Sequence, residues 1–244
     1  LQSGRRNPVA QLLKIYGYTF DNARMDLKAY PETGLNGQLE VASLRTGNLL
    51  LDKTTAIITQ DTSALQLHCA VENTSRKNPN KFKVYLDGSF MDGALSLESR
   101  FKDAKGKDGI HFGLKGEMTP KHCFSLHVFP ETSVIAYRKF KVNTDNYITI
   151  SPDLQLEANV DLLADDMTGL KINAERADSV NDITVSLSHV NIEELCSVFP
   201  YLPRMSGFLG GDFHVIRQQG SFSASGALEI SRFHYGTYDM GDFN

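Results

Sequence analysis

The sequence predicts an all-β protein: a long, mostly antiparallel sheet with one or two short helices. Three observations lead to this fold class. Apolar and polar residues alternate with period two in many runs, glycines precede several of these runs, and turn-forming pairs separate them. Successive side chains of a strand point to opposite faces, so this alternation indicates a sheet with one apolar and one solvated face, which favours antiparallel pairing.

The first expected element is a short helix over residues 8–16, with Pro8 in its first turn, where a missing amide hydrogen is tolerated. Almost all of the chain after it alternates. The clearest run is 154–162, in which five apolar residues face one way and four polar residues, 155, 157, 159 and 161, face the other. Three further runs are Leu65, Leu67, Cys69 and Val71; Phe82, Val84 and Leu86; and Ile110, Phe112 and Leu114.

Glycines and turn pairs divide these runs. Glycines at 37, 47, 93, 211 and 226 are each followed by apolar residues at the second and fourth positions, which predicts a turn that opens a strand. Turns are also expected at four pairs, and residues 73–80 are expected to form a polar loop. The four pairs are Asp92-Gly93, Asp108-Gly109, Asp145-Asn146 and Gln219-Gly220.

A second short helix is expected over residues 191–199. Asn191 is a favourable N-cap, and Glu194 stands three residues later, where its carboxylate can return to the cap amide. Pro200 then ends the helix. A short helix beside a long sheet often covers an open edge or end.

Composition excludes several classes of protein. The chain has 244 residues and a formal net charge of −4, so it lacks the basic excess typical of nucleic-acid binding. No apolar run approaches the 18 or so residues of a membrane span, and no targeting signal is visible after Leu1. We therefore expect a mature fragment or an excised piece of a longer protein, with any anchor or targeting signal outside it. Three widely spaced cysteines give no disulfide framework.

The residues that carry chemistry are few. His68-Cys69 and His122-Cys123 suggest zinc ligands, but adjacent residues of a strand point to opposite faces, so thiols in the core beside imidazoles on the surface are the better interpretation. Asp165-Asp166 is a possible carboxylate pair, although its surroundings are typical of a hairpin loop. The prediction is a protein without enzymatic activity, metal or cofactor.

From about Ser151 onward the chain resembles the TamB branch of the AsmA-like family, the inner-membrane subunit of the translocation and assembly module. The segment His189-Val190-Asn191-Ile192, the segment 207–211 and the closing 226–230 stretch fit the family's repeat of strand, short helix, proline and glycine-led strands. Met240-Gly241 stands where the family usually has Leu-Gly. Upstream, residues 30–150 share with the family only the alternation of apolar and polar residues and glycine-containing segments such as 34–38.

The resemblance implies a periplasmic sheet rolled into an open trough with an apolar inner face, anchored in the inner membrane by a segment not present here. It implies partners of two kinds: phospholipid or another lipid, and an outer-membrane assembly protein of the Omp85 type. The function expected is shielding of acyl chains or of nascent outer-membrane protein strands during outer-membrane biogenesis and protein secretion. Three parts are expected: a lead-in over 1–30, a sheet half over 31–150 and a repeat-bearing half over 151–244.

The residues expected to line the groove are the apolar members of the alternating runs in the last part. Two other functions stay open: a β-sandwich or β-helix module of an extracellular adhesin or glycan-processing protein, and, more distantly, an outer-membrane β-barrel. The groove candidates are Leu154, Leu156, Ala158, Val160, Leu162, Leu170, Ile172, Ile183, Val185, Leu187, Phe213, Val215, Phe222, Ala224, Leu228 and Ile230.

Overall fold

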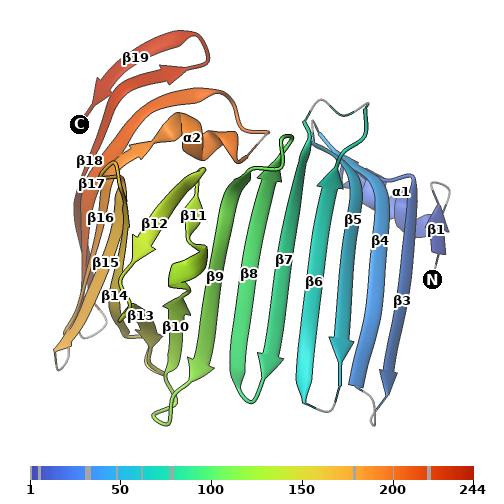
Figure 1. Cartoon of the computed structure of the whole chain (residues 1–244), viewed down its shortest axis with the longest axis horizontal. Helices are drawn as coiled ribbons and strands as arrows, with labels where there is room; N and C mark the ends of the chain where they lie inside the picture. The colour runs from blue at the N-terminus through green and yellow to red at the C-terminus, as the bar shows by residue number, and fades with distance from the viewer. Residues whose placement is uncertain are drawn as a thin grey trace. The chain divides into compact units, whose positions relative to one another are not determined.

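The computed structural model describes residues 2–4, 7–30, 34–47, 49–61, 63–76, 78, 80–177, 180–199, 201–218 and 221–244. Over these residues the chain is all-β: its strands form one long antiparallel sheet, not closed into a barrel, with two short helices (Figure 1). The fold class predicted from alternation is confirmed. By internal contacts the chain divides into two compact units, residues 1–111 and residues 112–244.

Unit 1 is an antiparallel sheet in which strands that follow one another in the chain also pair. The order is β1–β3–β4–β5–β6–β7–β8, with β2 paired to the end of β4. The expected first helix is present as α1. The elements are β1 (Gln2–Gly4), α1 (Pro8–Ile15), β2 (Tyr18–Thr19), β3 (Asn22–Tyr30), β4 (Gly34–Thr46), β5 (Leu49–Gln60), β6 (Ala64–Asn73), β7 (Phe82–Met91), β8 (Ala94–Asp103) and the first residues of β9 (Asp108–Met118).

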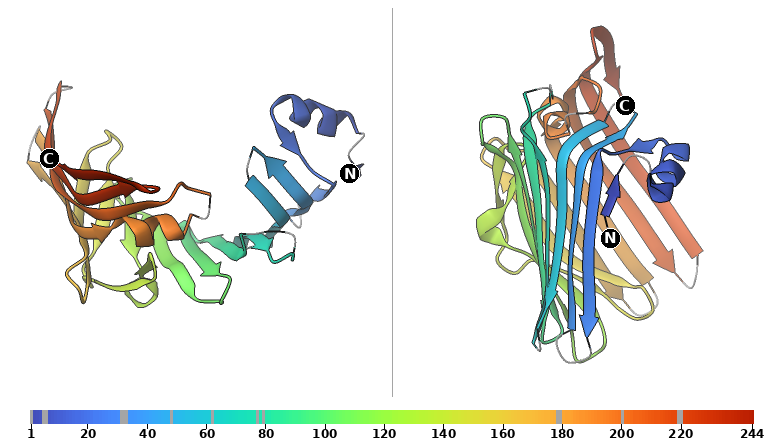
Figure 2. Two further views of the ribbon diagram at one scale, coloured as in Figure 1. Left: turned by 90° about the horizontal axis from the view of Figure 1, so that it is seen from above. Right: turned by 90° about the vertical axis from the view of Figure 1, so that its right-hand side faces the viewer.

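Unit 2 contains the rest of β9, four short strands (β10–β13), five longer ones (β14–β18) and a final six-residue strand, β19. Strands β17 and β18 are the longest, and they lie side by side (Figures 1 and 2). The elements are β10 (Phe124–Val128), the 3-10 turn η1 (Pro130–Thr132), β11 (Val134–Ile135), β12 (Arg138–Val142), β13 (Tyr147–Ile150), β14 (Leu156–Ala164), β15 (Gly169–Ala177), β16 (Val180–Asn191), α2 (Ile192–Ser197), β17 (Met205–Gln218), β18 (Ser221–Tyr235) and β19 (Tyr238–Phe243).

The hydrophobic core lies in unit 2. Strand β10 pairs with both β9 and β13, and β14 pairs with both β12 and β13, so the short strands bring apolar side chains onto β14 and β15. The centre of the core is Val128, Val142, Val160 and Leu162, which are 2–8% exposed. Partly buried residues packed around it are Phe112, Leu114, Ile135, Phe140, Ile148, Leu170 and Ile172.

Helix α2 begins as the sequence predicts. The side chain of its N-cap, Asn191, accepts a hydrogen bond from the amide of Glu194 at 3.2 Å. The carboxylate of Glu194, expected to return to the cap amide, instead accepts a hydrogen bond from Arg138 Nε, which ties the helix to β12. Pro200, the expected stop, lies outside the described residues. Neither helix among the described residues has the length and apolar character needed to cross a bilayer.

Buried asparagines hold strand ends in place. Asn73, at the end of β6, is fully buried; its side chain accepts from the Asp52 amide at 2.7 Å and donates to the Leu50 carbonyl at 2.8 Å. Asn181 accepts from the Leu156 amide at 2.8 Å and donates to the Leu156 carbonyl at 2.6 Å. Each amide side chain therefore pairs with another strand as a peptide group does, which satisfies buried backbone groups. The expected loop at 73–80 is thus anchored by its first residue.

Several expected boundaries differ from the structure. Gly47 and Gly93 lie at turns with positive φ, but Gly37, Gly211 and Gly226 lie inside β4, β17 and β18. At Gly226 the Phe213 ring occupies the space that a side chain would need, so this position requires glycine for packing. Asp108-Gly109 opens β9, and the turn precedes it at 104–107. The pair Gln219-Gly220 lies outside the described residues.

Candidate functional site: uncovered apolar sheet faces

The groove candidates from β14 to β18 lie on one face of unit 2. Residues directly opposite in an antiparallel ladder place their side chains on the same face. The register pairs Val160 with Ile172, Ile172 with Val185 and Val185 with Phe213. Two neighbouring rows show the same pairing from strand to strand. One consists of Ala158, Ala174, Ile183, Val215 and Ala224, and the other of Leu162, Leu170, Leu187, Gly211 and Leu228. The structure therefore brings these candidates together.

Burial changes steadily across this face. Ala158, Val160 and Leu162 on β14 are only 4%, 2% and 3% exposed, because they belong to the core described above. On β18 the same face is open: Phe222 is 71% and Leu228 is 43% exposed. The β14 candidates are thus occupied by protein contacts, those of β16 and β17 are partly exposed, and those of β18 include the most exposed side chains of this face.

Leu154 departs from the set. Strand β14 begins at Leu156, and Leu154 lies in the preceding turn with φ +61° and a side chain 71% exposed. Its carbonyl accepts a hydrogen bond from Arg217 at 2.8 Å. Leu154 fits the alternation of residues 154–162 only because it is apolar and lies two positions before Leu156; it is not part of the strand. The expected boundary between residues 150 and 151 lies between β13 and β14, which pair with each other within unit 2.

Unit 1 carries a second apolar face, which was not among the sequence candidates. One row across it runs Met25, Leu39, Ala56, Cys69 and Leu86, each paired with the next. This row ends on β8 at the polar Ser99, and the rows beside it have the same character, with Thr54 and Gln60 as polar exceptions. We call this surface the open apolar face. It consists of Ala23, Met25, Leu27, Ala29, Leu35, Leu39, Val41, Ala56, Ile58, Leu65, Leu67, Cys69, Val71, Val84, Leu86, Phe90, Leu95 and Leu97.

None of these described residues is buried. Leu27 is 54%, Phe90 is 49%, Met25 is 41% and Leu39 is 38% exposed. Around Gly37, which has no side chain, the face is hollowed into a shallow groove of about 210 Å³ lined by Leu27, Leu39 and their neighbours. Soluble monomers seldom expose contiguous apolar surface of this extent, and such surface marks an interaction site.

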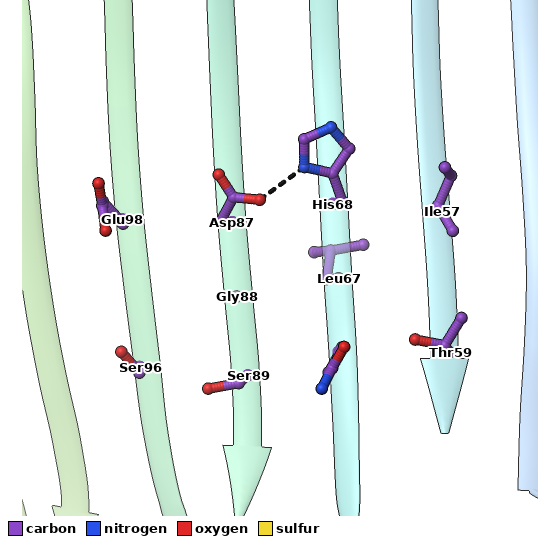
Figure 3. A pocket seen from close by; sticks show the side chains of 10 residues that line it. Ile57, Thr59, Leu67, His68, Asp87, Gly88, Ser89, Ser96 and Glu98 are labelled. Atoms are coloured by element: carbon purple, nitrogen blue, oxygen red, sulfur yellow. Dashed lines mark hydrogen bonds and ion pairs between the residues drawn. The ribbon is translucent and has the colours of Figure 1, made fainter. Parts of the chain in front are cut away.

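The opposite face of the unit 1 sheet is polar. Figure 3 shows a depression on it, about 380 Å³ in volume, where His68 Nδ1 lies 2.5 Å from Asp87 Oδ1. Beside it, Glu98 Oε1 lies 2.6 Å from His111 Nε2 and 2.9 Å from Arg100. These side chains are partly solvated and pair with one another across strands, as charged residues do on a water-facing sheet.

The candidate metal ligands do not converge. His68 lies on the polar face and Cys69 on the open apolar face, as their adjacency in a strand requires. His122 lies in a turn with φ +58° beside Cys123, and Cys196 lies in α2, where burial raises the pKa of its thiol. Among the described residues, no group of three or more His, Cys, Asp or Glu side chains is placed to hold a metal ion.

The carboxylate pair at 165–166 lies in the β14–β15 turn, as expected for a hairpin loop. Asp166 pairs with Arg138, and Asp165 Oδ1 accepts from Lys141 Nζ at 2.8 Å. That hydrogen bond lowers the pKa of Asp165 below its usual 3.8 and raises the pKa of Lys141 above its usual 10.5. Both carboxylates are thus held by cations of β12, and the arrangement is that of a stabilised turn.

Replacing Lys141 with methionine is expected to raise the pKa of Asp165 back toward 3.8, because the hydrogen bond from Lys141 is the main cause of its depression. The stabilisation from Asp165 is present above pH 3.8 and is lost as the pH falls through the folded pKa; that from Lys141 is present below pH 10.5 and is lost as the pH rises through its folded value. Carboxyl NMR titration measures the change. Asp61, whose low pKa comes from the Ser63 and Ala64 amides, serves as the control and should not move.

Comparisons of this chain with protein-family models, with curated proteins and with solved structures find no match.

Proposed function

We propose that this chain is a non-enzymatic segment of a TamB/AsmA-like envelope protein, and that its uncovered apolar sheet faces shield phospholipid acyl chains or nascent outer-membrane protein strands. The observation that carries the proposal is the open apolar face of unit 1. Its rows continue across β3 to β8 with few polar interruptions, and Phe101, which ends one row on β8, is its buried member at 5% exposed.

The dimensions of the face suit a hydrocarbon chain. Four rows of side chains, spaced two residues apart along the strands, span about 20 Å. Half the hydrocarbon thickness of a bilayer, which is the length that one acyl chain covers, is about 15 Å. Each Å² of apolar surface that leaves water contributes about 25 cal/mol, and both the chain and the sheet would lose such surface on contact.

The chemistry of the face also favours an apolar, weakly oriented occupant. Pockets for water-soluble ligands carry a few convergent polar groups that fix orientation. On the open apolar face the polar groups are Thr54, Gln60 and Ser99, and they stand in different rows. A β-sandwich, the alternative, would cover this face with a second sheet, whereas Leu27 and Phe90 are about half exposed.

Site-specific photocrosslinking tests the proposal. A photoreactive amino acid is placed at Leu39, Leu86 or Leu228, and at the next residue of each strand, Glu40, Asp87 or Glu229, whose side chain points to the other face. In the presence of phospholipid vesicles we expect lipid adducts, identified by mass spectrometry, from the apolar positions only. Adducts of equal yield from both members of each pair would contradict the proposal.

A further inference from the structure

The two ends of the unit 1 sheet differ in charge. Because consecutive strands are antiparallel, the β4–β5, β6–β7 and β8–β9 connections share one end, and the β5–β6 and β7–β8 turns share the other (Figure 1). The first end carries exposed cationic side chains; we call it the basic end. The described residues of the other two turns include Asp61 and Asp92 and no Lys or Arg. The cationic residues of the basic end are Arg45, Arg76, Lys81, Lys105 and Lys107.

Carboxylates balance only part of this positive charge: Asp52 and Asp103 lie at the same end, where they accept hydrogen bonds from the Ser75, Lys105 and Lys107 amides. Lys102 pairs with Asp108 at 2.8 Å, and Lys83 approaches Glu72 at 3.9 Å. Within the described part of the chain, Arg76, Lys81 and Lys105 have no carboxylate partner. Like charges gathered at one end of a sheet repel one another, so a bound anion would stabilise this arrangement.

The basic end is also structurally defined. The loop that carries Arg76 and Lys81 is anchored by Asn73 and by Asn78, whose side chain donates to the Leu50 carbonyl at 3.0 Å. Next to β4 at the same end, a pocket of about 300 Å³ is lined by residues that include Lys14, Arg45 and one carboxylate, Asp21. The cations thus have fixed positions at one end of the strands that carry the open apolar face.

We infer that the ligand of unit 1 is an amphiphile with an anionic headgroup, bound with its hydrocarbon tail along the open apolar face and its headgroup at the basic end. The inference deepens the proposed function and rests on it. The apolar rows would bind a hydrocarbon tail equally well in either of its two orientations along the strands. The charge difference between the two ends supplies the direction and disfavours a cationic headgroup. A phosphate or a carboxylate headgroup satisfies the same cations.

Binding of dodecyl phosphate, dodecylphosphocholine and dodecyltrimethylammonium to the full chain, each below its micelle-forming concentration, is measured by calorimetry. The tails are identical, so differences in affinity report the headgroup. We expect dodecyl phosphate to bind about tenfold more tightly than the other two at low salt, with the difference shrinking as salt is added. Inorganic phosphate should not compete. If it competes at similar concentration, the basic end is a free-anion site and the assigned orientation is wrong.

Charge reversal separates the headgroup inference from the proposed function. The triple variant Arg76→Glu, Lys81→Glu, Lys105→Glu should bind dodecyl phosphate about tenfold more weakly and dodecylphosphocholine unchanged. Its control, Lys139→Glu, Lys171→Glu, Arg204→Glu, changes net charge equally at exposed sites of unit 2 and should bind as the parent does. Equal binding of all three amphiphiles, lost in Leu27→Ser/Leu39→Ser, would overturn the headgroup inference and keep the proposed function. Absence of binding by any of them would overturn both.

Discussion

Replacing Asn146 with alanine is expected to lower the free energy of unfolding of unit 2 by at least about 2 kcal/mol. Both backbone groups of Val128 lose their partner, and the Asn143 carbonyl keeps only the Asn146 backbone amide at 3.3 Å. The Asn146 side chain is 3% exposed; it accepts from the Val128 amide at 2.6 Å and donates to the Val128 carbonyl at 3.1 Å and the Asn143 carbonyl at 2.8 Å. Each buried polar group left without a partner costs about 1–3 kcal/mol. Val128 is itself a core residue, so the loss of these hydrogen bonds is expected to destabilise the hydrophobic core of unit 2.

Hydrogen exchange of the β10 and β14 amides measures this effect within unit 2 without assuming that both units unfold together. Asn173→Ala is the matched control: it removes the same side chain from an exposed position of β15, and we expect a change below about 0.5 kcal/mol. A similarly small change in Asn146→Ala would mean that water replaces the side chain at the end of β10.

Period-two alternation made much of the fold predictable. A strand with one apolar face has apolar residues at every second position of its sequence. Strands β6, β14 and β16 lie where this alternation predicts them. Strand ends were less predictable, because the turn chemistry of Asp108-Gly109 also suits the first residues of a strand. Leu154 shows the same limit, since an apolar residue in a turn continues the pattern without continuing the strand.

The exposure of the candidate face was not predictable in the same way. Alternation shows which side chains share a face, but it does not show what covers that face. Val160 and Phe222 have the same pattern around them, yet one is 2% and the other 71% exposed. The difference comes from β10 to β13, short strands whose packing depends on residues distant in the chain. The buried asparagines escaped detection because Asn in polar surroundings is typical of loops.

The open apolar face of unit 1 was visible in the sequence as alternation but not as a site. Its runs, such as Leu65, Leu67, Cys69 and Val71, carried no motif that distinguished them from a covered sheet. Only the register, which aligns β3 to β8 in common rows, shows that the runs join into one surface.

Truncating Leu162 to alanine is expected to lower the free energy of unfolding by about 2–4 kcal/mol, whereas the same change at the next residue, Leu163, should cost less than about 1 kcal/mol. Leu162 is 3% exposed within the core, and Leu163 is 41% exposed on the opposite face of the same strand. The two variants remove the same atoms, so the difference between them measures the covering of the β14 face.

The comparison extends to unit 1 through Leu39→Ala. Leu39 lies on the open apolar face and is 38% exposed, so its truncation should resemble that of Leu163, with a cost below about 1 kcal/mol. Amide exchange in β3 to β5 reports this value separately from unit 2. A cost as large as that of Leu162→Ala would show that the face is covered in solution, for example by a second copy of the chain; in that case the cost should fall on dilution. A small cost at every concentration is what an uncovered face requires, and it leaves Leu39 free to contact a ligand.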